Sequence, residues 1–242
     1  MVADMVTAMA TRMTEAQDAA APAPLVRLLH LVSPSLPVGG FTYSQGIEWA
    51  VEQGWLRDAS DTERWLADQL EASLVRLDLP LAARMMVAVA AAERNALAGW
   101  IDLLLASRET SELRAEERQR GRALADLLRA WDLPEVGAWR DLLAQSQTAG
   151  FAFAAVRWNI PVADALSGLA FAWVENLTLA AIKLVPLGQT DGQRILARLA
   201  AAVPGAVDLA LALRDDAIGA SSPALAIASA RHEQQYTRLF RS

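Results

Sequence analysis

Apolar residues recur at three- and four-residue spacing along most of this chain, and this helical period is the feature that most restricts its fold. Apolar and polar residues nowhere alternate as they do in a half-buried strand, and β-branched residues are sparse. The sequence therefore predicts an all-α fold, a single-domain bundle of about ten helices. The clearest stripe, within residues 60–78, consists of Trp65, Leu66, Leu70, Leu74 and Leu77.

Proline, glycine and capping residues indicate where the helices begin and end. The tetrapeptide Ser60–Glu63 is interpreted as a capping box, and Pro80 suits the first turn of the following helix. Residues 81–94 are apolar on nearly all sides, so we expect this helix at the centre of the core. The expected helices cover residues 25–32, 47–55, 60–78, 81–94, 97–107, 112–131, 134–147, 150–155, 162–184, 191–201, 207–218 and 224–240.

Composition excludes several classes of site. The 242 residues carry a formal net charge of −6 and include no cysteine, which excludes disulfides, thiolate metal sites and cysteine nucleophiles. An acidic chain is a poor match for broad nucleic-acid binding, and no run of about 18 uninterrupted apolar residues predicts a membrane span. These features are compatible with a cytoplasmic protein that binds neither nucleic acid nor membrane. Residues 1–24 are interpreted as a disordered or misassigned extension, and residues 25–242 as the folded domain.

The least helix-like passage is Ser33–Trp49, with the sequence SPSLPVGGFTYSQGIEW. Pro34 and Pro37 favour extended backbone in the residues before them, and the Gly39-Gly40 pair permits angles that other residues avoid. A rigid loop that presents aromatic and hydroxyl groups suits a binding surface. From the residues alone, an ordinary connection between two helices is the alternative.

Motifs for catalysis and metal binding are weak in this sequence. Ser44-Gln45-Gly46 lacks the first glycine and the preceding strand of a nucleophile elbow. His30 and His232 are the two histidines and lie far apart, so no preformed metal site is predicted, although a transient carboxylate-lined metal path stays open. Lys183 is expected to extend along a helix end rather than to form a Schiff base. Five charged residues of the 112–131 helix are expected to be mostly solvated: Glu116, Glu117, Arg118, Arg120 and Arg122.

Residues 231–242 (RHEQQYTRLFRS) mix basic groups with Tyr236, Leu239 and Phe240. Such a segment can fold upon a partner that buries the aromatic side chains and pairs its carboxylates with the arginines. A C-terminal helix that packs on its own domain explains the same residues equally well. The residues alone leave both interpretations open.

Five blocks of sequence, in order, resemble the urease accessory protein F (UreF) family. Together they span about residues 25–242, and the first 24 residues take no part in the resemblance. The blocks are SPSLPVGGFTYSQGIEW (33–49), SRETSELRAEERQRG (107–121), GFAFAAVRW (150–158), KLVPLGQTDGQ (183–193) and HEQQYTRLFRS (232–242). Members of this family are all-α and non-enzymatic, so the resemblance implies the same of this chain.

The resemblance further implies a homodimeric scaffold in the cytoplasmic machinery that inserts nickel into urease. Such a scaffold bridges accessory protein D (also called H) and the GTPase accessory protein G, which together prepare apo-urease. It implies no tightly bound cofactor, since nickel is handled transiently within the complex.

In the family, the proline- and glycine-rich loop and the C-terminal tail shape partner docking. By matched position, Phe41 and Arg238 are the leading partner-binding candidates. Family members often carry tyrosine where this chain has Phe41, so a hydrogen bond from that position is in doubt. The other implied partner-binding residues are Tyr43, Ser44, Gln45, His232, Glu233, Tyr236, Leu239, Phe240 and Arg241.

Two alternatives belong to other functional classes. In the first, Arg238 or Arg241 acts as an arginine finger that directly regulates GTP hydrolysis by a partner GTPase. In the second, the chain is a helical enzyme whose base is Glu48 or Glu175, which requires a cleft that holds a carboxyl group of raised pKa.

Overall fold

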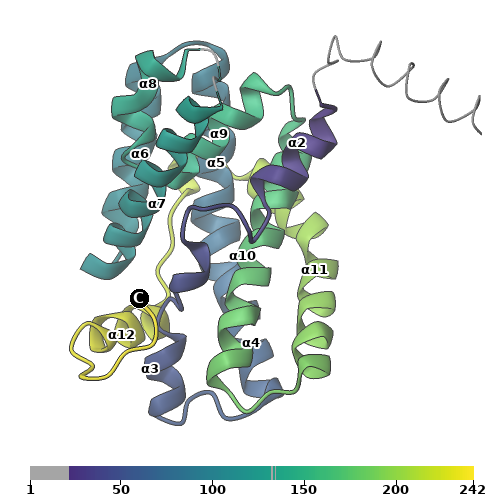
Figure 1. The fold of residues 1–242 in the computed structure, drawn as a ribbon, viewed down its shortest axis with the longest axis vertical. Coiled ribbons are helices and arrows are strands. Elements are labelled where there is room, and N and C mark those ends of the chain that lie inside the picture. The colour runs from purple at the N-terminus through teal and green to yellow at the C-terminus, as the bar shows by residue number, and fades with distance from the viewer. Residues whose placement is uncertain (1–21, 132, 134) are drawn as a thin grey trace, which may run out of the picture.

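A computed structural model describes residues 22–131, 133 and 135–242 (Figure 1). Every regular element among these residues is helical, which confirms the predicted all-α single-domain bundle. Except for its last three residues, the predicted extension at residues 1–24 lies outside the described part of the chain, and Pro24 already begins the first described helix. The α-helices are α2 (Pro24–Leu31), α3 (Ile47–Glu52), α4 (Ala59–Gln69), α5 (Leu79–Ala90), α6 (Arg94–Ser107), α7 (Ser111–Ala130), α8 (Val136–Leu143), α9 (Gln147–Arg157), α10 (Val162–Leu184), α11 (Gln189–Ala212) and α12 (Pro223–His232).

Two apolar clusters share α5 between them. The upper cluster in Figure 1 lies among α5 to α9 and takes Leu81 and Met85 from α5. The lower cluster lies among α4, α10 and α11 and takes Leu79 and Ala83 from α5. Because α5 is buried on nearly every side, it joins the two clusters into one core. The predicted central position of this helix is therefore confirmed.

The predicted capping box at Ser60–Glu63 is wrong by two residues. The N-cap of α4 is Asp58, whose carboxylate accepts a hydrogen bond from the Asp61 backbone N–H at 2.9 Å. Asp61 in turn accepts from the Arg57 side chain at 3.0 Å. An aspartate caps a helix as well as a serine does, so residue type alone did not distinguish the two positions.

The predicted boundary near Pro80 is confirmed, since one element ends at Asp78 and α5 begins at Leu79 with Pro80 in its first turn, but no break separates the two. The chain stays helical from α4 through a π-helical stretch, Leu70–Asp78, into α5. Proline has no N–H to give to the carbonyl four residues earlier, which here belongs to Arg76. That carbonyl instead accepts from the Gly219 backbone N–H at 2.9 Å. A distant loop therefore satisfies the group that Pro80 leaves open, and the wider π-helical turn accommodates the ring.

Near the C-terminus, two predicted helices form one element and a third is shorter than predicted. The segments 191–201 and 207–218 belong largely to α11, which continues through Pro204. Val203 and Val207 on either side of this proline are buried in the lower cluster, so packing outweighs the break that proline favours. The predicted helix 224–240 ends already at His232, the last residue of α12.

Helices α10 and α11 are long and apolar enough to cross a membrane by length and composition. The core helices of a globular bundle meet the same test, and these two pack on each other and on α5. The predicted absence of a membrane partner stays a prediction.

Candidate functional site

The loop, α3, the first half of α7 and the C-terminal tail come together at one end of the bundle (Figure 1). The tail, residues 233–242, follows α12 as turns and extended chain. Its last residues lie against the loop: the Arg241 N–H donates to the Thr42 carbonyl at 2.8 Å, and the Ser242 carbonyl accepts from the Ser44 N–H at 2.6 Å. The hydroxyl of Ser44 donates to the same carbonyl at 2.5 Å. The loop and the tail, about 200 residues apart in sequence, therefore form one unit.

Gly46 allows this close approach. Its φ angle of +82° lies in the left-handed region, where a side chain causes strain. A Cβ atom at this position would also lie 2.9 Å from the Cβ of Ala228 in α12. A glycine is therefore required where the loop turns into α3 beneath the last helix.

His232 joins the tail to both neighbouring helices. Its side chain is fully buried, with Nδ1 2.8 Å from a carboxylate oxygen of Glu112 and Nε2 3.3 Å from one of Glu48. The same Glu48 carboxylate accepts from the backbone N–H groups of Leu239 at 2.6 Å and Phe240 at 2.8 Å. Glu112 accepts from the Arg238 guanidinium at 2.7 Å. Two carboxylates, on α3 and α7, thus hold the end of α12 and residues 238–240 of the tail.

Glu233 caps α7 from outside that helix. Its carboxylate accepts from the Ser111 hydroxyl at 2.6 Å and from the backbone N–H groups of Ser111 at 3.0 Å and Glu112 at 3.2 Å. The first hydrogen bond is the main cause of a pKa lowered from the usual glutamate value. A negative charge at a helix N-terminus is stabilising, because that end carries exposed N–H groups and a partial positive charge.

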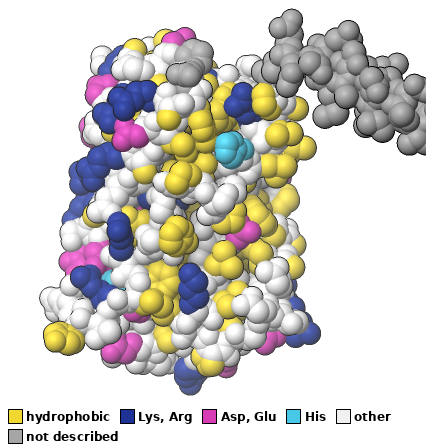
Figure 2. Space-filling model, viewed as in Figure 1, with side chains coloured by type: hydrophobic (Ala, Val, Ile, Leu, Met, Phe, Trp, Pro, Cys, Tyr) yellow, Lys and Arg dark blue, Asp and Glu magenta, His cyan; other side chains and the backbone are white. Residues whose placement is uncertain are grey.

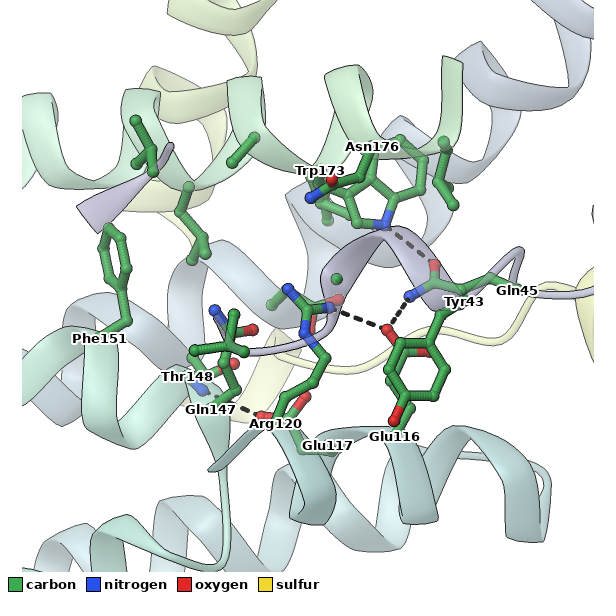
Figure 3. A pocket seen from close by; sticks show the side chains of 18 of the residues that line it. Tyr43, Gln45, Glu116, Glu117, Arg120, Gln147, Thr148, Phe151, Trp173 and Asn176 are labelled. Atoms are coloured by element: carbon green, nitrogen blue, oxygen red, sulfur yellow. Dashed lines mark hydrogen bonds and ion pairs between the residues drawn. The ribbon is translucent and has the colours of Figure 1, made fainter. Parts of the chain in front are cut away.

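Behind the loop lies a cavity with about 90 Å³ of space for water, lined by polar and apolar side chains (Figure 3). One carboxylate oxygen of Glu116 accepts from Gln45 at 3.1 Å and from Arg120 at 2.9 Å, while the other accepts from the Ser242 hydroxyl at 3.2 Å. The Gln45 carbonyl accepts from the Trp173 indole N–H at 3.0 Å. Glu116 therefore connects the tail to the cavity wall, and the space suits a few water molecules.

An ionic cluster of Asp78, Arg108 and Glu117 also lines this cavity. Arg108 contacts Asp78 and, at 3.4 Å, Glu117. Burial by itself lowers the pKa of Arg108, but the two carboxylates outweigh it and raise the pKa further above its usual range. Burial raises the pKa of Asp78. Burial acts in the same direction on Glu117, yet Arg108 together with the Thr148 N–H and a serine hydroxyl lowers its pKa overall.

The prediction that the charged residues of α7 are mostly solvated is wrong for Glu116, Glu117 and Arg120, whose side chain is 16% exposed and pairs with Glu116. Glu116 and Glu117 are buried, with 4% and 6% of their surface exposed. Each has its charge met by an arginine and by hydrogen-bond donors from other elements, which is the condition under which a buried carboxylate is tolerated. Helical spacing on α7 could have indicated this, since Glu112 and Glu116 lie four residues apart and share the face that the tail covers.

The eleven predicted partner-binding residues all lie in this unit but fall into two groups. Tyr43, Ser44, His232 and Phe240 are buried, and Gln45 is half-buried, so these five hold the unit together. Phe41 is 58% exposed, Leu239 is 69% exposed, and Tyr236 extends fully into solvent. The exposed group consists of Phe41, Glu233, Tyr236, Arg238, Leu239 and Arg241.

The remaining candidates from the sequence have simple environments. Lys183 is exposed in the last turn of α10, with its ammonium 5.7 Å from the centre of the Phe240 ring. Burial raises the pKa of Glu175, which is half-buried on α10. His30 is exposed, and the centre of its ring lies 4.6 Å from the centre of the Trp131 ring. Within residues 22–131, 133 and 135–242, no group of three or more histidine and carboxylate side chains is placed to hold a metal ion.

Comparison with known proteins identifies the family of this chain. A profile of the UreF family matches residues 56–200. Proteins named urease accessory protein UreF align with 90% of this chain in Pseudomonas putida strain W619, at 54% identity, and in Escherichia coli O157:H7, at 48% identity. The namesake in Alcanivorax borkumensis is 51% identical over 89% of the chain. Each alignment covers 97% of the relative. The chain belongs to the UreF family.

Proposed function

We propose that this protein is a non-enzymatic scaffold for the maturation of urease, required for the insertion of nickel. It bridges accessory protein D (or H) and the GTPase accessory protein G in the cytoplasm, and through them acts on apo-urease. The names of the relatives support a role as an accessory protein. The observation that carries the proposal is the assembly of loop and tail into one unit with outward-facing apolar and basic side chains.

The exposed side chains of this unit have the character of a docking surface. Tyr236 and Leu239 present apolar area, and Arg238 and Arg241 lie beside them with their charges at the surface. A shallow hollow between the tail and α7 is lined by Glu112, the two arginines and neighbouring residues. Aromatic and arginine side chains dominate the binding energy of many protein interfaces. A partner surface with apolar pockets and carboxylates would complement this one.

Nickel is handled transiently in this proposal and has no tight site on the chain. A site of high affinity for such an ion recruits several nitrogen or sulfur ligands. This sequence offers two histidines and no cysteine, and both ring nitrogens of His232 already face carboxylates.

A second copy of the chain is expected on the apolar face around α2 and α10. Leu25, Val26 and Leu29 of α2 are more than half exposed, and Phe171 of α10 is 36% exposed. Figure 2 shows hydrophobic side chains gathered around α2. A contiguous exposed patch of this kind is typical of an interaction site. Leu29→Glu should therefore convert a dimer to a monomer in light-scattering measurements.

The principal test is co-purification with the cognate D (or H) and G proteins, using the full chain and a chain that ends at Glu233. The shortened chain keeps buried His232 and the cap on α7. The scaffold proposal expects a complex with the full chain and loss of the GTPase from the complex with the shortened one. Equal assembly of both chains would show that the tail is not a docking element.

Regulation of GTP hydrolysis is the second candidate, because Arg238 and Arg241 are exposed and an arginine supplied in trans can stabilise phosphoryl transfer. Arg238→Ala separates the two candidates, with exposed Arg231→Ala on α12 as control. As a scaffold, the Arg238 variant loses assembly. If Arg238 is an arginine finger, the variant assembles normally while GTP hydrolysis by the partner slows.

A further inference from the structure

We infer that Glu48 is the positioning residue that holds the tail in its docking conformation. Glu48 lies on α3, far from the tail in sequence, and is 8% exposed. Its two carboxylate oxygens accept from two backbone donors of the tail, the Leu239 N–H and the Phe240 N–H, and one of them lies 3.3 Å from Nε2 of His232. No residue of this segment forms a helix or strand after His232 in the described structure, so these bonds replace those that regular structure would supply.

The two consecutive N–H groups decide which side chains the tail presents. With the amides of residues 239 and 240 directed at Glu48, Phe240 turns inward to 6% exposure and Leu239 turns outward to 69%. Arg238 and Arg241 on either side are exposed as well. Charge-assisted bonds to a buried carboxylate are about twice as strong as neutral ones, so the two amide bonds to Glu48 are a strong polar attachment of the segment.

Other contacts hold the tail at Glu233, at Arg238 and at its last two residues, and Glu48 is the acceptor for the two amides between Arg238 and Arg241. Glu233 is bound to the start of α7, and Ser242 is bound to Ser44. Between these ends, Tyr236 lies fully in solvent. Without the Glu48 carboxylate, the backbone N–H groups of Leu239 and Phe240 would lose their acceptor, while the bundle would keep both apolar clusters.

The test uses Glu48→Gln, which preserves the shape of the side chain but removes its charge and one acceptor. Glu52→Gln is the matched control, because Glu52 lies on the same helix and is exposed. The chain has no cysteine, so Tyr236→Cys gives a single site for a spin label in the tail. A label at Val87→Cys on exposed α5 surface reports on the bundle.

A positioning role predicts that Glu48→Gln makes the label at residue 236 about ten-fold more mobile while the label at residue 87 and the melting temperature of the bundle change little. Glu52→Gln should change neither label. Equal mobility at residue 236 in Glu48→Gln and in the unsubstituted chain overturns the inference. If Glu48→Gln does not fold, Leu239→Pro and Leu239→Ala replace it, because proline removes the N–H and alanine keeps it. The label at residue 236 should then be more mobile in Leu239→Pro than in Leu239→Ala. Equal mobility of that label in the two variants overturns the inference.

The link to docking rests on the proposed function and is measured separately. Glu48→Gln should weaken binding of the accessory partner about ten-fold or more, and Glu52→Gln should leave it unchanged. Failure of the unsubstituted chain to bind either accessory protein contradicts the proposed function, whatever the labels show. Normal binding by a Glu48 variant whose tail is mobile contradicts the inference while the proposed function stands.

Discussion

The two halves of α7 are attached to the molecule by different chemistry. The second half, from Gly121 to Ala130, packs Leu124 and Leu128 into the upper apolar cluster. The first half, from Ser111 to Arg120, contributes carboxylates to the ionic cluster, the cavity and the tail. Apolar contacts are non-directional, so the second half provides stability, whereas the hydrogen-bonded half selects one arrangement of its neighbours. The candidate docking surface is built on the hydrogen-bonded half.

Leu128→Ala tests the apolar half and should have the largest effect on stability. Leu128 is fully buried, and removal of such a side chain leaves a cavity that costs about 2–5 kcal/mol of unfolding free energy. Leu127→Ala, at the half-buried preceding position, is the control and should lower the unfolding free energy by less. Urea denaturation measures both values. A cost for Leu128→Ala no larger than that of the control would contradict the division between the halves.

Glu117→Gln tests the polar half and should cost about 3 kcal/mol at pH 7, because it leaves Arg108 with one carboxylate fewer in a buried site. The folded-state pKa of Glu117 is lowered, so its charge stabilises the fold above the unfolded value of about 4.3. That contribution to stability is lost as the pH falls through the folded-state pKa of Glu117. The difference between variant and unsubstituted chain should therefore shrink below about pH 4 in urea titrations. A difference that is constant with pH would show that shape, not charge, is responsible.

Gly121→Ala tests the boundary between the halves. A Cβ at this position would lie 2.7 Å from backbone atoms of Ser146, where α7 crosses the start of α9. Backbone cannot move aside as a side-chain tip can, so a loss of about 2 kcal/mol is expected. Gly99→Ala in α6 is the control, since nothing lies within 4 Å of its Cβ, and it should be neutral or stabilising. Thermal unfolding of both variants distinguishes the outcomes, and equal effects would exclude a steric role for Gly121.

Glu233→Gln should have the smallest effect, about 0.5–1 kcal/mol, since it weakens the charged cap on an exposed helix end. The folded-state pKa of Glu233 is lowered, so this contribution is present at neutral pH and lost on acidification. Amide hydrogen exchange at Ser111 and Glu112 should be faster in the variant, while the second half of α7 stays protected. Faster exchange along the whole helix would mean that the two halves are not independent.

Local patterns predicted the helical parts of this chain well. The helix 162–184 has its predicted bounds, and the central position of the apolar segment 81–94 is confirmed. Distant groups decide whether the chain stays helical across two of its prolines. Gly219 satisfies the carbonyl left open by Pro80, and the lower cluster keeps α11 helical through Pro204. Gly219 lies far from Pro80 in the sequence, and most of the lower cluster lies far from Pro204. Helical spacing and proline alone therefore predicted two helices where α11 is continuous.

For the candidate site, the sequence grouped two segments that lie together in the structure, but it did not indicate which of their residues are buried and which are exposed. The signature loop and the last residues were singled out together, and the structure brings them into contact. Their division into exposed residues, such as Leu239, and residues that hold the unit together, such as Ser44, required the structure. Glu48 was considered as a catalytic base, whereas its carboxylate is engaged by the tail.

By itself, the sequence determined the helical class, the central helix and the family, because helical period, apolar content and motif order are properties of short stretches of chain. The tertiary structure alone decided the burial of Glu116 and Glu117 and the course of the tail after His232. The physical reason is that a carboxylate is tolerated inside a protein when charges and donors surround it. For these residues the donors come from Arg108, Ser146 and Ser242, which folding brings together from separate parts of the chain.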